Sequence, residues 1–205
     1  IADDHAVVRR GVREILEEAL LGIAVDEAGS ASETLKAIRD KAYDIVLLDI
    51  AFPDGNGLDV LRQIRSHRPS TRVLLLSMYS EEQYAQRALR SGAAGYLTKD
   101  RAPDELIDAI RKVAAGGKYI TQSLAERLAD EIGAEVEPAP HETLSDREFQ
   151  IMIRLAAGKS VGEIAAELAL SPKTVSTYRS RVLEKLNVKT TAEIVRYVLE
   201  NRLGN

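Results

Sequence analysis

The feature that most constrains the fold of this chain is a short apolar run that leads directly into a carboxylate. Residues 45–48 are all aliphatic, Asp49 follows them, and residues 52–57 consist mostly of Pro, Gly, Asp and Asn. An apolar run beside turn residues is typical of a strand that is buried on both faces of a parallel sheet. Ligands of such sheets bind at the carboxyl ends of the strands. We therefore expect Asp49 at a sheet edge where a ligand binds.

The first part of the chain, residues 1–116, alternates between two apolar spacings. Helical spacing covers residues 7–20, 30–41, 58–68, 80–91 and 104–115. Short extended runs cover residues 23–28, 45–48, 73–76 and 95–98. Ile1 and Ala2 end a further strand, most of which we expect upstream of a chain that begins without Met. Strands that alternate with helices predict an α/β fold, a doubly wound parallel sheet of five strands in the flavodoxin-like order.

The remainder of the chain has only helical patterns. A helix is expected at about residues 121–132, and the composition of residues 133–143 indicates a linker of low order. Further helices are expected at residues 146–157, 160–168, 171–186 and 191–201. We therefore predict a domain at residues 1–116, a linker at 117–143, and a small all-α, four-helix domain with a helix-turn-helix at 144–205.

Composition and charge exclude several classes of protein. The chain has no Cys, which excludes disulfides and fits a reducing cytosol, so we expect a cytoplasmic protein. We find no apolar run long enough to span a membrane and no signal-peptide pattern, so we expect no membrane partner. Residues 144–205 carry ten Lys or Arg against seven Asp or Glu, although the whole chain has a net charge of −4. An acidic first part and a basic tail predict two modules with different partners.

Three carboxylates are expected to meet at one edge of the predicted sheet. Asp3 and Asp4 end the first strand and Asp49 ends the third, and these strands are neighbours in the flavodoxin-like order. Like charges at this distance raise one another's pKa, and Mg²⁺ would relieve the repulsion. Ser77 and Lys99 end the next two strands. A carboxylate nucleophile beside a hydroxyl, an ammonium and Mg²⁺ suits a phosphoryl group, which the carboxylate would accept as an acyl phosphate.

This part of the chain resembles the receiver domain of two-component response regulators. The resemblance rests on Asp3-Asp4, Asp49 with Pro53 and Gly57, Ser77, Tyr96 and Lys99. It implies that Asp49 accepts a phosphoryl group from a sensor histidine kinase. The implied ligands of Mg²⁺ are Asp4, Asp49, the backbone carbonyl of Ala51, and Asp3 through water. The implied partners of the phosphoryl group are Lys99 and Ser77, with Tyr96 rotating inward as a switch.

One residue departs from the receiver pattern, and plainer interpretations remain for the others. Asp100 follows Lys99 where many receivers have a proline after a cis bond; a cis bond before a non-proline residue costs about 3 kcal/mol, so we expect a trans bond. Taken singly, the acids are explained by a surface turn or a helix cap, and only their joint placement at strand ends favours a site. His5 is a candidate metal ligand, but we expect it at a helix N-terminus facing solvent.

Two alternative functions use the same residues. A Mg²⁺-dependent phosphohydrolase can also use an Asp nucleophile after an apolar strand. Such enzymes usually place a second acid two residues later, where Ala51 stands, so this alternative is disfavoured. A receiver that binds proteins without phosphorylation is a third hypothesis, which the complete set of pocket residues disfavours.

The predicted helix at residues 171–186 is basic and polar on one side. Lys and Arg supply phosphate contacts, and a polar helix fits the major groove, although a solvated amphipathic face is the plainer interpretation. Residues 144–205 also resemble the LuxR-type helix-turn-helix domain, through residues 144–148, 158–160, 163–165, 170–175 and 186–188. The resemblance directs Ser176, Thr177 and Ser180 toward bases of double-stranded DNA. Its candidates for phosphate contacts are Lys173, Thr174, Arg179, Arg181 and Lys185.

The combination of the two resemblances is that of the NarL/FixJ class of response regulators. It implies a phosphorylation-controlled, DNA-binding transcriptional regulator that is not an enzyme. The helix at residues 191–201 resembles the dimerisation helix of this class, although simple packing on the other three helices explains it equally well. We therefore expect a homodimer on activation.

Overall fold

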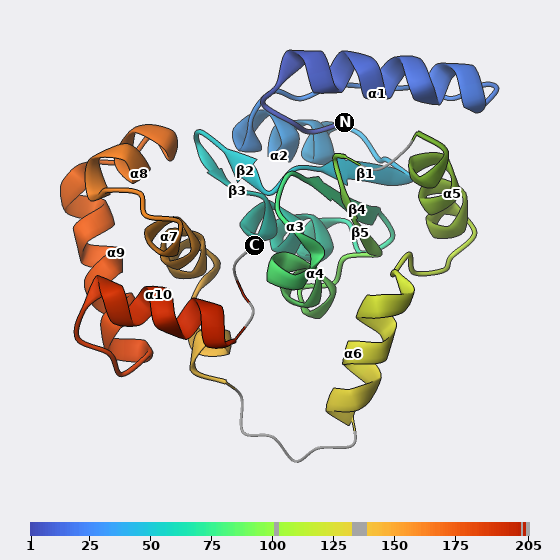
Figure 1. Ribbon diagram of the computed structural model, residues 1–205. Helices are drawn as coiled ribbons and strands as arrows, with labels where there is room; N and C mark the ends of the chain where they lie inside the picture. The colour runs from blue at the N-terminus through green and yellow to red at the C-terminus, as the bar shows by residue number, and fades with distance from the viewer. Residues whose placement is uncertain (101–102, 133–138, 202, 204–205) are drawn as a thin grey trace. The chain divides into compact units, whose positions relative to one another are not determined.

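The chain forms two compact units in the computed structural model, Ile1–Glu126 and Arg127–Asn205. The structure describes residues 1–100, 103–132, 139–201 and 203 (Figure 1). Within these residues, no helix has the length and hydropathy that crossing a membrane requires.

The first unit is built on a parallel sheet. Strands β1 (Ile45–Leu48), β4 (Arg72–Ser77) and β5 (Gly95–Thr98) pair in the order β1-β4-β5. Ala2 forms parallel bridges to Leu48 and to Ala28. The order across the sheet is therefore the predicted flavodoxin-like one. Its first two positions, at Ala28 and Ala2, are single bridges rather than full strands.

Helices cover both faces of this sheet. They are α1 (Ala6–Ala19), α2 (Ala31–Asp40), α3 (Gly57–His67), α4 (Glu81–Arg90) and α5 (Pro103–Ala114). One core cluster joins apolar residues of α1 and α5 to Leu47, Leu74 and Leu97 of the strands. Leu48 and Leu75 are also fully buried, and they point to the opposite face because strand side chains alternate. Figure 1 shows α1 and α3 on opposite sides of the sheet. Burial on both faces is the reason why the strand sequences are continuous apolar runs.

A small hairpin stands between β1 and α3, where the sequence indicated only a turn. Strands β2 (Ala51–Phe52) and β3 (Gly55–Asn56) pair in the antiparallel sense. At the base of the hairpin, the N–H of Gly57 donates to the carbonyl of Ile50 at 2.8 Å. The side chain of Asn56 then caps α3 by accepting the N–H of Leu58 at 2.8 Å. The segment after Asp49 is therefore a defined hairpin and not an open loop.

The second unit has the four predicted helices. They are α7 (Asp146–Ala156), α8 (Val161–Glu167), α9 (Pro172–Lys185) and α10 (Thr191–Glu200). Ser145 with Glu148, and Ser160 with Glu163, form capping boxes at the starts of α7 and α8. Helix α7 contacts α9 and α10, and α8 contacts α9. The four helices therefore share one core.

The segment between the two domains differs in part from the prediction. Helix α6 (Gln122–Ile132) forms where a helix was expected, and Leu124 is 1% exposed. Residues 133–138 lie outside the described residues. Residues Pro140–Thr143 form a 3₁₀ helix, η1, in which the N–H of His141 donates to the hydroxyl of Tyr197 at 3.2 Å. The prediction of low order is therefore wrong for residues 140–143, because their partner is 56 residues away in sequence and local composition does not reveal it.

Candidate functional site

Two acids and one lysine meet at the carboxyl ends of the strands. The Nζ atom of Lys99 lies 2.6 Å from Oδ2 of Asp49 and 2.6 Å from Oδ2 of Asp3. The three side chains are between 3% and 5% exposed. The N–H of Ile50 donates to the other oxygen of Asp49, Oδ1, at 2.7 Å. The parallel sheet thus brings residues 3, 49 and 99 into direct contact because each follows the end of a strand or bridge.

Burial and pairing act in opposite directions on these charges. Burial raises the pKa of Asp49, and Lys99 offsets only part of that effect. Burial lowers the pKa of Lys99, but the carboxylates of Asp49 and Asp3 outweigh it, so the pKa of Lys99 is raised. The lysine is therefore held in its charged form beside a carboxylate that is costly to ionise. The cation next to Asp49 therefore favours the ionised form of this carboxylate.

The acids also form a group that suits a divalent cation. Ligand atoms of Asp3, Asp4, His5 and Asp49 all lie within 4.8 Å of one another. The Oδ1 atom of Asp4 is buried and accepts no hydrogen bond among the described residues. Its contact with Nδ1 of His5, at 2.7 Å, is an ion pair only when the imidazole is protonated. Carboxylate oxygens are the ligands that Mg²⁺ prefers, so the donor set fits this ion.

The structure agrees with the expected position of His5 and with the expected trans bond before Asp100. His5 is the residue before α1, and its side chain is 64% exposed, which agrees with a position facing solvent. Its ring nevertheless points Nδ1 toward Asp3 and Asp4, a contact that the sequence analysis did not include. No described peptide bond is cis, so the bond between Lys99 and Asp100 is trans, as expected.

Ser77 and Tyr96 both form hydrogen bonds with the backbone of Tyr79, in the loop that follows β4. Ser77 is fully buried, and its Oγ accepts the N–H of Tyr79 at 3.2 Å. The hydroxyl of Tyr96 donates to the carbonyl of Tyr79 at 2.7 Å. Tyr96 is 1% exposed and already directed inward, so this structure does not show an outward position from which the expected rotation would start; burial is the main cause of its raised pKa. A movement of either side chain would therefore change the hydrogen bonds of the loop between β4 and α4.

Gly57 has a steric role that the sequence analysis did not identify. A Cβ atom at this position would lie 1.9 Å from the backbone oxygen of Asp49 and 2.8 Å from Cα of Ile50. The start of α3 thus passes directly against the backbone of the candidate nucleophile. A Gly at the start of a helix is itself a signal of a close backbone approach, which the turn and the receiver motif alone do not indicate.

The candidate DNA-binding residues lie on α9, which has one buried side and one open side. Val175 and Val182 are fully buried and attach the helix to the core of the second unit. The exposed candidates are Lys173, Ser176, Thr177, Ser180, Arg181 and Lys185, and Thr174 is partly exposed. The hydroxyls of Thr177 and Ser180 donate to the carbonyls four residues earlier, at 3.0 and 3.1 Å. The open side therefore presents cations and hydroxyls at the surface.

Two candidates on α9, Arg179 and Lys185, have partners within the unit. The Nε atom of Arg179 donates to the hydroxyl of Thr191 at 3.0 Å. The Nζ atom of Lys185 lies 2.6 Å from Oε2 of Glu148, whose side chain is 4% exposed. Burial opposes the charged form of Glu148, but the hydrogen bonds from Lys185 and Ser145 outweigh it and lower its pKa. Lys185 and Arg179 thus connect α9 to α7 and α10, and their contacts with phosphates remain predictions.

Comparisons with known proteins cover both units. Residues 1–111 match the family model of the response regulator receiver domain, and residues 142–198 match that of the bacterial regulatory proteins of the luxR family. Response regulator UvrY of Escherichia coli K12 is 38% identical over 207 residues, which span all of this chain and 94% of UvrY. Response regulator GacA of Pseudomonas viridiflava is 36% identical over 195 residues, which span 95% of this chain and 91% of GacA. A structure of two RcsB dimers bound to two parallel DNAs aligns with a TM-score of 0.58 at 26% identity, and the alignment covers 97% of this chain and 95% of RcsB.

Proposed function

This chain belongs to the response regulators in which a receiver domain precedes a LuxR-type DNA-binding domain, and we propose that Asp49 is its phosphoacceptor. As a member of this family, the protein is a phosphorylation-dependent, DNA-binding regulator of transcription. The phosphoryl donor that a receiver domain implies is a sensor histidine kinase. The observation that carries the assignment is the buried carboxylate of Asp49, 2.6 Å from the Nζ atom of Lys99.

The proposed reaction is transfer of a phosphoryl group from a phosphohistidine to Asp49. An oxygen of Asp49 forms a bond to phosphorus while the N–P bond breaks, and the histidine nitrogen keeps the electron pair of that bond. Lys99 then pairs with an oxygen of the acyl phosphate that results. Asp4, Asp49 and the carbonyl of Ala51 would hold Mg²⁺ directly and Asp3 through water, and the bound ion supplies neutralisation of the phosphoryl oxygens.

The response to phosphorylation begins, in this proposal, at the loop after β4. The hydroxyl of Ser77 turns to the phosphoryl group and no longer accepts the hydrogen bond from the N–H of Tyr79. Tyr96 keeps its inward position against the carbonyl of the same residue. The loop and the start of α4 therefore change their hydrogen bonds when Asp49 carries phosphate, which is how a local charge alters the surface of the receiver.

Small acyl phosphates separate this function from its two rivals. We expect the full chain with acetyl phosphate and Mg²⁺ to gain one stable phosphoryl group, measured by intact-protein mass spectrometry. The variant Asp49→Asn should gain none. Asp59→Asn is the matched control, because Asp59 is an exposed acid that pairs with Arg62. Rapid multiple turnover would support a phosphohydrolase instead, and no reaction would support a protein-binding module.

For the second domain, we propose that the open side of α9 contacts double-stranded DNA. Ser176, Thr177 and Ser180 would face bases, while Lys173 and Arg181 would contact phosphates with Thr174 beside them. The RcsB structure with dimers on DNA supports homodimers as the bound form. Leu199 of α10, which is 64% exposed, suits a surface that a second copy covers. A transcription regulator without Cys fits the cytoplasm.

Phosphorylation should therefore change both assembly and DNA affinity. We expect acetyl phosphate to shift the full chain from monomer to dimer in analytical ultracentrifugation. We expect the same treatment to tighten binding to fragments selected from a genomic pool. Asp49→Asn should show neither change, and a variant that dimerises equally with acetyl phosphate would contradict the proposal.

A further inference from the structure

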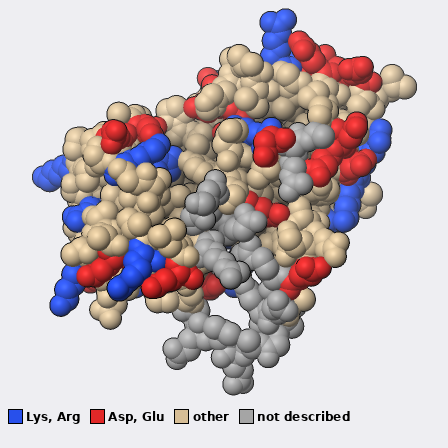
Figure 2. Space-filling model, in the orientation of Figure 1, with Lys and Arg blue, Asp and Glu red and all other residues tan. Residues whose placement is uncertain are grey.

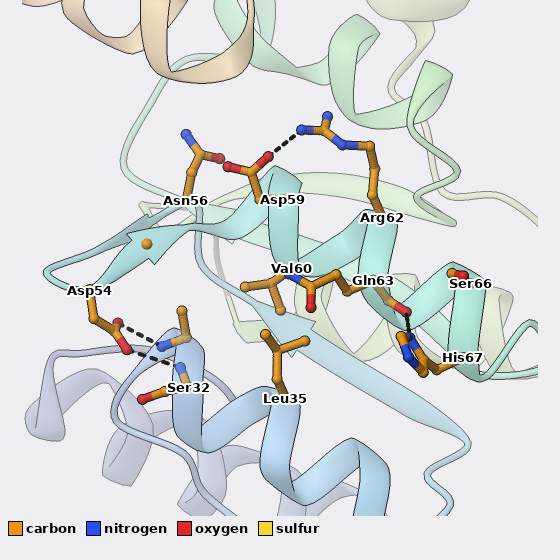
Figure 3. Close-up of a pocket in the computed structure, with 12 residues that line it drawn as sticks. Ser32, Leu35, Asp54, Asn56, Asp59, Val60, Arg62, Gln63, Ser66 and His67 are labelled. Carbon is orange, nitrogen blue, oxygen red and sulfur yellow. Dashed lines mark hydrogen bonds and ion pairs between the residues drawn. The ribbon is translucent and has the colours of Figure 1, made fainter.

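The tip of the hairpin after Asp49 is attached to a helix that lies far away in sequence. The two carboxylate oxygens of Asp54 accept the N–H groups of Ala31 and Ser32, at 2.9 and 3.0 Å (Figure 3). These are the first two residues of α2, more than twenty positions earlier. Burial raises the pKa of Asp54, but its hydrogen bonds, those from Ser32 and Ala31 foremost, outweigh burial and lower the pKa, so the carboxylate is charged at neutral pH. Asp54 therefore acts as a charged clamp between hairpin and helix.

The same contact is supported by packing. A Cβ atom on Gly55 would lie 2.9 Å from Cβ of Ala31, so the hairpin tip rests directly on the start of α2. The third N–H of the helix, that of Glu33, is satisfied by the side chain of Ser30 at 3.1 Å. The start of α2 is thus shared between a local cap, Ser30, and a remote one, Asp54.

The hairpin needs this attachment because it is very short. Each strand has two residues, and an isolated two-stranded hairpin is marginally stable at best. Its base is fixed where the N–H of Gly57 meets the carbonyl of Ile50, and its tip is fixed by Asp54. Ala51 lies between these two anchors. The direction of its backbone carbonyl therefore depends on both of them.

We propose that Asp54 is a positioning residue that fixes the hairpin so that the carbonyl of Ala51 can bind the divalent cation of the phosphoryl-transfer site. The inference rests on the proposed function, which makes that carbonyl a Mg²⁺ ligand. Asp54 does not touch the cation; it acts through the backbone of residues 51–53. A simple helix cap would affect only stability, whereas a positioning residue also affects the affinity for Mg²⁺.

The test is a titration of the unphosphorylated full chain with MgCl₂ by isothermal calorimetry. We expect Asp54→Ala to weaken Mg²⁺ binding by up to about fivefold, which is the most that the energy of one lost cap could transmit to the cation site. Asp54→Asn keeps one acceptor oxygen and should weaken it about twofold. Both variants remove the same charge, so a difference between them isolates the hydrogen bonds from electrostatic attraction. Solvent reaches Asp54 through the open groove between α2 and α3, so neither variant leaves a cavity in the core (Figure 3).

Ser30→Ala is the matched control, because it removes a cap from the same end of α2 without touching the hairpin. It should leave the affinity for Mg²⁺ unchanged. Hydrogen exchange without Mg²⁺ gives a second readout: peptides that cover residues 50–56 should exchange faster in Asp54→Ala and not in Ser30→Ala.

Three results would overturn the inference. Equal affinities of Asp54→Ala and Asp54→Asn would assign the effect to charge alone. An equal loss of affinity in Ser30→Ala would reduce Asp54 to a helix cap. If the unmodified chain did not bind Mg²⁺, the proposed cation site would fail and the inference with it, whereas binding that is unaffected by Asp54→Ala would overturn the inference alone.

Discussion

The backbone of Gly57 lies so close to the backbone of Asp49 that we expect the addition of a single methyl group at position 57 to destabilise the first domain. The variant Gly57→Ala would place a methyl group 1.9 Å from the carbonyl oxygen of Asp49. Ordinary contacts of this kind are longer by roughly 1.5 Å or more, and both atoms belong to fixed backbone. The start of α3 or the end of β1 must therefore move. Gly57 is not among the glycines with positive φ, so conformational freedom does not explain its presence.

The cost can be estimated from the groups that move. Overpacking of a core site costs about 1–3 kcal/mol. Movement at this point also strains the bond from the N–H of Gly57 to the carbonyl of Ile50, which contributes about 1 kcal/mol. Replacement of Gly by Ala in a helix stabilises the helix by about 1 kcal/mol, which offsets part of this cost. The last two contributions cancel, so we expect a net loss of about 1–3 kcal/mol in the stability of the first domain.

Native-state hydrogen exchange measures this change in the full chain without assuming that both domains unfold together. Slowly exchanging amides of β1 and β4 should exchange about 5- to 150-fold faster in Gly57→Ala. The control is Gly11→Ala, in the interior of α1, where a Cβ meets nothing within 4 Å. The same chemical change should there stabilise the domain by about 0.5–1 kcal/mol. If both variants shifted exchange in the same direction, the steric argument would be refuted.

Three further predictions concern single contacts. Lys173→Ala should weaken binding to all duplexes and lower the slope of log affinity against log salt by about one, measured by fluorescence anisotropy; an unchanged slope would exclude a phosphate contact. The pKa of Glu148 is lowered by its hydrogen bonds with Lys185, so the stability from this pair should be complete above the ordinary pKa of 4.5 and be lost as pH falls through the lowered value. Thermal melting of Glu148→Gln over the same pH range should not show this loss of stability. If the stability of both proteins fell equally with pH, the assignment to Glu148 would be contradicted. Thr121→Val removes the hydrogen bond to Glu81 at 2.8 Å and should speed exchange at the start of α6, whereas Thr121→Ser should restore it.

The parts of the fold that could be predicted are those with local causes. The apolar run at residues 45–48 indicated a strand buried on both faces, and the sheet has helices on both faces. The capping signals at Ser145 and Ser160 marked the starts of α7 and α8. The rule that strand ends meet at one sheet edge brought Asp3, Asp49 and Lys99 together before any contact was known. Each of these inferences uses neighbours in sequence or one topological rule.

The parts that could not be predicted depend on pairs that are distant in sequence. Asp54 looks like an ordinary turn residue. It accepts hydrogen bonds from Ala31 and Ser32 only because the first residues of α2 lie beside the hairpin. The hairpin itself was missed because each of its strands has only two residues, which is too short for a periodic pattern. His141 was assigned to a low-order linker because its partner, Tyr197, is on the last helix.

Three lysines show why residue type and position on an element do not define a role. Lys99 and Lys185 both lie 2.6 Å from carboxylates that are 4% exposed, Asp49 and Glu148. A lysine beside a buried acid stabilises that acid, and it can serve a ligand only if the acid is itself part of the site. Asp49 is at a strand end with two further carboxylates, so under the proposed function Lys99 would pair with an incoming phosphoryl group. Glu148 is inside a capping box, so Lys185 stabilises the start of α7, and the exposed Lys173 is the better candidate for a DNA phosphate.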